Sequence, residues 1–230
     1  MLSLLKHLYG FVAIGMGYLR GTDAPTALSS ALHDVPFTPS PQTLMKTFLI
    51  TLLSVLALLA GRPAATSYRL DPAASTLAWT GHAEAGSWAP QGTIRLREGR
   101  VLADGVAVRA ARVVVDMATI AHEQAPLAEH LRHADFFDVA RFPTAVFELT
   151  EFKVGQARGT LTLKGVTKPV AFPVTVAAAP GGGLRLRGTA TVDRTQFGIN
   201  YNSTAFFQNL GSYAVRNDFQ VAFDVLARPQ

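Results

Sequence analysis

Apolar residues recur at every second position in several short stretches of the chain, and this period of two limits the fold more than any other feature. In residues 218–225 (DFQVAFDV), phenylalanines and valines alternate with aspartate, glutamine and alanine. Residues 160–165 and 170–177 alternate in the same way. Because successive side chains of a β-strand point to opposite faces, the pattern predicts antiparallel strands with one apolar face and one face in water.

Turn signals rich in glycine and proline separate these stretches, for example ADG at 103–105 and APGGGL at 179–184. REGR at 97–100 is expected to form a turn of the same kind. Short strands at regular spacing predict an all-β domain, and the residues by themselves leave open whether it is a barrel or a sandwich. We expect about eight strands, at residues 75–81, 92–98, 112–118, 145–152, 160–165, 170–177, 184–188 and 218–225.

Residues 121–141 break the alternation. Pro126 suits the first position of a helix, and Leu127 and Leu131 lie one helical turn apart. The sequence therefore predicts one short helix near residues 126–133, followed by an irregular segment. A single helix in such a sheet protein is expected to plug or flank one end.

Composition and charge exclude several classes of protein. The chain has no cysteine, which rules out disulfides, thiolate zinc sites and a thiol nucleophile. The net charge is +5, and the arginines are scattered along the chain rather than gathered in a stripe. No nucleic-acid partner is therefore predicted.

Residues 45–60 (MKTFLITLLSVLALLA) have the order of a secretory signal, with a short positive end, an apolar run and small residues after it. The apolar run is short for a membrane span. We therefore expect a signal peptide over 45–67 that directs a mature domain, residues 68–230, to the periplasm or the exterior without an integral membrane segment. Residues 1–44 are expected to be a misassigned extension before the true start at Met45, and a real N-terminal extension is the alternative.

The chemistry-bearing residues give little support for an enzyme. His130 and His133 would share a helix face and could chelate a metal with His122 or Asp135, but the HExxH spacing is missing. No nucleophile elbow, P-loop or dinucleotide-binding motif is present. No catalytic residue, metal or cofactor is predicted, and a metal-dependent hydrolase that uses His130 and His133 is kept as an alternative. Asp135 and Asp138 are expected to bond backbone amides of a turn.

The aromatic residues leave the interior undecided. Many of them fall on inward positions of the predicted strands, as an ordinary core requires. A closed barrel of about eight strands can either pack solid or keep room for one ligand. A solid-core interaction or stress-related module without a small ligand is therefore a second alternative.

Five stretches together resemble the YceI-like family, and the likeness runs in order from Tyr68 to Arg228. It implies a lipocalin-like antiparallel β-barrel, exported to the periplasm, with an elongated apolar cavity. Some members of the family bind polyisoprenoid lipids, others are domains of unknown role, and the family offers no catalytic motif to transfer. The stretches are WTG (79–81), VVVDMATI (113–120), HLRHADFFDVARFPTAVFE (130–148), GTLTLKGVTKPVAF (159–172) and DRTQFGINYNSTAFFQNLG (193–211).

The resemblance implies that Leu131, Phe136 and Phe137 close the barrel. It also implies an isoprenoid lipid, or a similar long apolar amphiphile, as the ligand. The loop GHAEAGSWAPQG at 81–92 departs from the family pattern, which leaves the preference for a headgroup open. The residues expected to line the cavity and contact the ligand are Trp79, Phe147, Leu149, Leu161, Leu163, Phe172, Val174, Phe219, Val221 and Phe223.

Overall fold

The computed structural model describes residues 40–42, 45–46, 49–50 and 65–230. The chain divides into two units, Met1–Ala60 and Gly61–Gln230, and the fold described below is that of the second unit. The predicted signal peptide and the extension before it fall mostly outside the described residues, so both stay predictions. None of the helices in the described residues has the length and apolar character that crossing a membrane requires.

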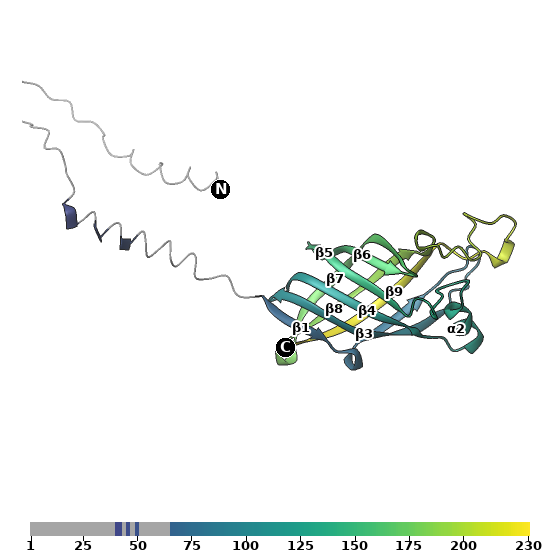
Figure 1. Cartoon of the computed structure of the whole chain (residues 1–230), viewed down its shortest axis with the longest axis horizontal. Coiled ribbons are helices and arrows are strands. Elements are labelled where there is room, and N and C mark those ends of the chain that lie inside the picture. Colours follow the sequence, from purple (N-terminus) through teal and green to yellow (C-terminus); the bar gives the residue numbers. More distant parts are fainter. Residues whose placement is uncertain (1–39, 43–44, 47–48, 51–64) are drawn as a thin grey trace, which may run out of the picture. The chain divides into compact units, whose positions relative to one another are not determined.

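The second unit is a closed antiparallel β-barrel with one α-helix (Figure 1). Its nine strands occupy eight positions, because β1 and β2 both pair with β3 on one side and β9 on the other. From β3 to β9 each strand pairs with the next one in the chain. The strands are β1 (Thr66–Leu70), β2 (Thr76–Thr80), β3 (Gln91–Asp104), β4 (Ala107–Ala121), β5 (Thr144–Lys153), β6 (Gln156–Leu163), β7 (Val166–Ala179), β8 (Gly183–Asp193) and β9 (Asp218–Pro229), and the helix is α2 (Ala125–Arg132).

The predicted barrel class and the predicted helix are both confirmed, and the helix begins and ends within one residue of the expected bounds. The register shows how the alternation is used. In the pairing of β8 with β9, Leu186 lies opposite Val225 and Gly188 opposite Phe223, and the side chains of Leu186, Val225 and Phe223 share the inner face. The outer face of the same two strands carries the charged residues Arg185, Arg187 and Asp224.

The prediction of a turn at REGR (97–100) is wrong. These residues lie inside β3, which runs on to Asp104 and carries a register shift between Leu96 and Glu98. Gly99 marks this irregularity, since a Cβ there would come within 2.5 Å of a methyl carbon of Leu70 and 2.7 Å of the Arg112 carbonyl oxygen. The glycine therefore allows a close approach between strands rather than a chain reversal.

The sequence prediction also missed β1. Its break from β2 is formed at Asp71, whose carboxylate accepts hydrogen bonds from the backbone amides of Ala73 and Ala74 at 3.0 and 3.2 Å. The same carboxylate pairs with Arg228 on β9 at 2.7 Å. These contacts hold two short strands in a single position of the barrel, so that β1 and β2 behave as one interrupted strand.

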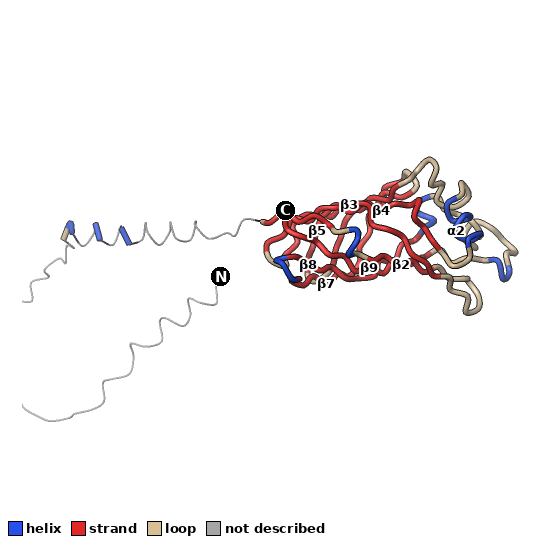
Figure 2. The backbone as a smooth tube through the Cα atoms, turned by 90° about the horizontal axis from the view of Figure 1, so that it is seen from below, coloured by secondary structure: helices blue, strands red, loops and turns tan. Residues whose placement is uncertain are grey.

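The two ends of the barrel differ. Tight turns at 105–106, 154–155 and 180–182 connect strands at the end where the C-terminus lies. α2 and the long connections lie at the opposite end, as the backbone trace also shows (Figure 2). Arg132 fastens α2 to the barrel by donating a hydrogen bond to the Ile120 carbonyl oxygen at 2.7 Å.

Candidate functional site

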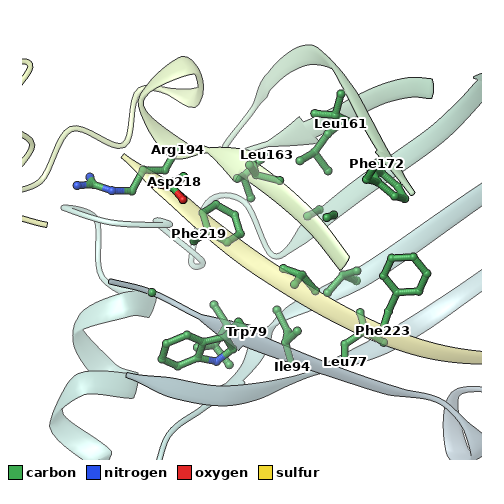
Figure 3. A pocket seen from close by; sticks show the side chains of 18 of the residues that line it. Leu77, Trp79, Ile94, Leu161, Leu163, Phe172, Arg194, Asp218, Phe219 and Phe223 are labelled. Atoms are coloured by element: carbon green, nitrogen blue, oxygen red, sulfur yellow. The ribbon is translucent and has the colours of Figure 1, made fainter. Parts of the chain in front are cut away.

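An apolar cavity of about 500 Å³ occupies the interior of the barrel. Side chains from all nine strands and from α2 line it. Ligand-binding cavities in proteins span roughly 300–1,000 Å³, so this volume is enough for one organic molecule. The alternation of the strands places almost all of the lining, and Figure 3 shows Leu77, Ile94, Leu161 and Phe223 on different strands around the interior.

All ten residues that the sequence predicts as cavity-lining lie on the wall of this cavity. Their contact with a ligand stays a prediction. They are Trp79, Phe147, Leu149, Leu161, Leu163, Phe172, Val174, Phe219, Val221 and Phe223.

Three strand glycines make room for three of the cavity aromatics. A Cβ at Gly92 would come within 2.6 Å of the Trp79 ring. A Cβ at Gly159 would come within 2.7 Å of the Phe147 ring, and one at Gly188 within 2.7 Å of the Phe223 ring. Each ring therefore lies against the backbone of a neighbouring strand, and this arrangement leaves the centre of the barrel open.

The aromatic rings also pack against one another along the wall. Phe172 lies between Phe147 and Phe223, with ring centroids 5.0 and 5.8 Å apart. These separations fall in the range of favourable tilted and edge-to-face pairs. The packing fixes the rotamers of the three rings, so the wall they form is preorganised for an apolar chain.

α2 and the segment after it cover part of the cavity at the α2 end of the barrel. Leu131, Phe136 and Phe137 are all buried and all line the cavity. The two phenylalanine rings meet edge to face at 4.9 Å, and Phe137 lies 6.1 Å from Phe219 on β9. The barrel-closing role that the family resemblance implies for these three residues stays a prediction.

The expected role of Asp135 and Asp138 is wrong. The Asp138 carboxylate pairs with the Arg141 guanidinium at 3.4 Å, and the Asp135 carboxylate pairs with the exposed His133 imidazole at 3.7 Å. Phe136 and Asp138 both donate their N–H groups to the His133 carbonyl oxygen rather than to a carboxylate. Within residues 65–230, the hydrogen bond of the Asp138 carboxylate goes to Arg141 and not to a backbone amide.

Arg194 is a functional candidate that the sequence reading missed. It is 1% exposed and lines the cavity, as does Asp218 (Figure 3). Its guanidinium donates hydrogen bonds to the carbonyl oxygens of Arg216, Ile199 and Val215 at 3.0, 2.8 and 2.9 Å. Burial lowers the pKa of this guanidinium, an effect that the nearby Asp193 carboxylate opposes. Arg194 thus fastens the long connection between β8 and β9 to the end of the barrel.

His130 supplies a polar atom that has no hydrogen-bond partner among the described residues. Its Nε2 atom is buried and makes no hydrogen bond, while the imidazole packs edge to face on Tyr201 at 4.6 Å. Both residues line the cavity. An unpaired buried donor or acceptor costs free energy, so this atom is available to a polar group of a ligand.

The metal-site hypothesis for His130 and His133 gains no geometric support. The His133 side chain is exposed and turned toward Asp135, whereas His130 packs against the aromatic residues of the closing segment. In the part of the chain that the structure describes, no three histidine, aspartate or glutamate side chains form a group that could hold a metal ion.

The cavity reaches the surface at the α2 end. Trp88 and Tyr213 belong to its lining, yet they are 55% and 77% exposed. The opposite end is filled by buried side chains, including Leu70, Val101 and Val108, which are at most 7% exposed. The cavity is therefore a blind channel with its mouth beside α2.

A family model described as YceI-like domain matches residues 68–227. Among curated proteins, a UPF0312 protein of Pseudomonas putida (strain W619) is 32% identical over 170 residues, which cover 68% of this chain and 88% of that protein. A UPF0312 protein of Pseudomonas aeruginosa (strain LESB58) is 37% identical over 97 residues, which cover 38% of this chain and 51% of that protein.

Two solved structures share the fold. BcnA of Burkholderia cenocepacia superposes with a TM-score of 0.56 at 20% identity, covering 68% of this chain and 98% of BcnA. A polyisoprenoid binding domain from Saccharophagus degradans, implicated in plant cell wall breakdown, superposes with a TM-score of 0.57 at 14% identity. This second likeness covers 72% of this chain and 99% of that domain.

Proposed function

Since the chain belongs to the YceI-like family, we propose that it binds an isoprenoid-type lipid, or a similar long apolar amphiphile, inside its barrel. The single observation that carries the proposal is the apolar blind channel of about 500 Å³. A barrel filled by its own side chains would leave no such volume, so the cavity favours a binding protein over a solid-core module. The polyisoprenoid binding domain from Saccharophagus degradans, which shares the fold, supports the same class of ligand.

The free energy of binding comes from burial of the chain. Each methylene group that moves from water to an apolar wall contributes about 0.8 kcal/mol. The rings of Phe147, Phe172 and Phe223 are already held in place by their packing, so little side-chain entropy is lost when a ligand enters. The wall therefore selects for apolar length rather than for a particular chemical group.

The polar end of the channel orients the ligand. The unpartnered Nε2 atom of His130 lies near the mouth, and Tyr201 and Asn202 line the same region. A hydroxyl, carbonyl or phosphate oxygen of the ligand would take this place, with the apolar chain pointing toward the closed end. Carriage or sequestration of such a lipid follows as the function.

The proposal is tested by native mass spectrometry of the gently purified protein, followed by mass analysis of the organic extract. We expect a bound species whose mass matches an isoprenoid lipid or another long-chain amphiphile, and which is lost on denaturation. Protein that is consistently empty when it is purified from its own host would contradict the proposal.

We also propose that the protein is exported by a signal peptide that begins at Met45. The order of charge, apolar run and small residues in 45–67 supports this. Because β1 begins at Thr66 and buries Tyr68 and Leu70, cleavage before Thr66 leaves the barrel intact. N-terminal sequencing of the exported protein should find its first residue between Gly61 and Tyr68, and a mature chain that retains residues 1–44 would contradict the assignment.

A further inference from the structure

We propose that the open end of the barrel docks onto a phospholipid membrane surface through four exposed aromatic side chains. We call Trp88, Phe206, Phe207 and Tyr213 the aromatic rim; they are 55%, 54%, 50% and 77% exposed. Exposed aromatic residues are costly in water, and tryptophan and tyrosine are characteristic of protein surfaces at the membrane–water interface. Docking onto a membrane is a property separate from ligand binding. Only the passage of a lipid from the membrane into the channel would rest on the proposed function.

The rim residues lie on two loops that hydrogen bonds join to each other. The first mouth loop is 81–90 and the second is 198–217. Glu84 donates its N–H to the Ala214 carbonyl oxygen at 2.9 Å, and Arg216 donates its N–H to the His82 carbonyl oxygen at 3.0 Å. The second loop projects beyond the strands at the α2 end (Figure 1). The four side chains are therefore presented by one joined structure rather than by independent loops.

The charge of the second mouth loop points to a lipid surface. Residues 198–215 contain no aspartate, glutamate, lysine or arginine, although the loop is exposed at several positions. Arg216, the first charged residue after this stretch, is paired with Asp218 at 3.0 Å. An uncharged loop that carries aromatic residues can enter the interfacial region of a bilayer without the cost of moving a charge out of water.

The rim is continuous with the cavity. Trp88 and Tyr213 line the channel and are also exposed, so the same side chains form the mouth and the surface around it. The opposite end of the barrel carries isolated exposed aliphatic residues, such as Val154 at 93%. A lipid that passes from a membrane into the channel would cross the surface around the mouth. The continuity of the aromatic rim with the channel therefore favours a lipid bilayer as the partner of the rim.

The test uses sedimentation with phosphatidylcholine vesicles and the variant Phe206→Asp/Phe207→Asp. Neither residue lines the cavity, and both are half exposed, so the fold and the channel should be kept. We expect the unmutated protein to sediment with the vesicles at low and high salt alike, since the interaction is apolar. The double variant should partition at least about tenfold less. Val154→Asp, at the other end, is the matched control and should partition like the unmutated protein.

A second readout locates the rim in the bilayer. In a Trp79→Phe background, Trp88 is the one remaining tryptophan. Its fluorescence should be quenched by brominated phosphatidylcholine in the vesicles, and the Phe206→Asp/Phe207→Asp variant should lose the quenching.

The outcomes separate docking from ligand binding. Failure of the unmutated protein to sediment would overturn docking, even if it binds a prenyl probe in solution. Sedimentation without any probe binding would keep docking and remove the proposed ligand. A dimer that the double variant dissociates, together with absence of vesicle binding, would assign the rim to a second copy of the chain and overturn the membrane proposal.

Discussion

Phe197 and Phe223 are the same residue type in two different environments of one barrel. Phe197 is 2% exposed and packs in the core outside the cavity wall. Phe223 faces the cavity, where it contacts the Phe172 ring and lies against the backbone at Gly188. A comparison of the stability lost on truncating each ring therefore distinguishes a barrel with a cavity from a barrel with a packed core.

Truncation of these two residues should therefore lower the stability of the barrel to different extents. Phe197→Ala should lower the free energy of unfolding by about 3–5 kcal/mol, because it leaves a void in a packed region. Phe223→Ala should cost less than about 2 kcal/mol in ligand-free protein, since its ring already borders empty space. Urea unfolding of the delipidated variants measures both stability losses. Binding of a fluorescent prenyl probe is measured in parallel. Equal stability losses would mean that Phe223 belongs to a solid core.

At the scale of single residues, alternation was sufficient to place the cavity wall. Every one of the ten residues expected to line the cavity faces it, because the side of a strand residue depends only on its parity. Arg194 and the free Nε2 of His130 could not be found in this way. Their environments depend on Val215, Arg216 and Tyr201, which are near them only in the folded chain.

The outer face of β8 and β9 carries an ion-pair cluster that belongs to the sheet rather than to the cavity. Asp224 on β9 accepts hydrogen bonds from Arg185 at 2.6 Å and from Arg187 at 2.9 Å, both on β8. The Arg185 hydrogen bond is the largest cause that lowers the pKa of Asp224 below its ordinary value of 3.8, while partial desolvation opposes it and Arg187 adds to it. The same contact raises the pKa of Arg185.

This lowered pKa predicts the acid dependence of the barrel's stability. A carboxylate with a lower pKa in the folded state stabilises the fold above its unfolded pKa, and the contribution is lost as the pH falls through the folded value. When the pH is lowered from about 6 to about 2.5, the urea unfolding midpoint of Asp224→Asn should therefore decrease less than that of the unmutated protein. The Arg185→Gln/Arg187→Gln variant should show the same reduced loss. An unchanged dependence in both variants would exclude Asp224 as a cause of acid sensitivity.

The long connection from β8 to β9 is fastened to the barrel by side-chain hydrogen bonds from Arg194. Three carbonyl groups of this connection, at Ile199, Val215 and Arg216, are satisfied by one side chain, Arg194. The guanidinium also lies over the Phe136 ring at 5.6 Å, which links the connection to the segment after α2. The end of the cavity therefore depends on the forked geometry of an arginine.

Replacement of Arg194 by lysine keeps the charge but loses the fork, so at least one buried carbonyl group is left without a donor. We expect Arg194→Lys to lower the free energy of unfolding by about 2–4 kcal/mol and to speed hydrogen exchange in residues 198–217. Arg158→Lys is the control, since Arg158 is an exposed partner of Glu151 at 3.8 Å, and its cost should be below about 0.5 kcal/mol. Matching exchange rates in the two variants would contradict the role given to Arg194.

Elements with a local sequence signal were predicted from the sequence, and elements that depend on contacts between distant residues were missed. The alternating stretches and the helix at 126–133 carry local signals, and both appear close to the expected positions. β1 offers only one alternating apolar pair, Tyr68 and Leu70, and the glycine of REGR by itself indicates a turn. A glycine is needed at position 99 because Leu70 and the backbone of Arg112, on other strands, come close to it.

At the scale of the whole molecule, closure of the sheet creates the cavity. The pairing of β3 with β4 is local, but the pairings of β1 and β2 with β9 join the two ends of the domain. Alternation within strands cannot distinguish such a closed sheet from two packed sheets, so the barrel was implied by the family resemblance and not by the residues alone. Buried side chains at one end and the aromatic rim at the other make the interior a channel with one mouth.

The most direct test of the account is titration of delipidated protein with a fluorescent prenyl probe, comparing the unmutated chain with Phe223→Trp. The larger ring points into the channel, so it should narrow the site while leaving the urea midpoint close to that of the unmutated protein. We expect one probe bound per chain and an affinity that falls by about tenfold or more in the variant. A folded, unmutated barrel that binds no probe, or a variant that binds it equally well, would contradict the claim that the channel holds the lipid.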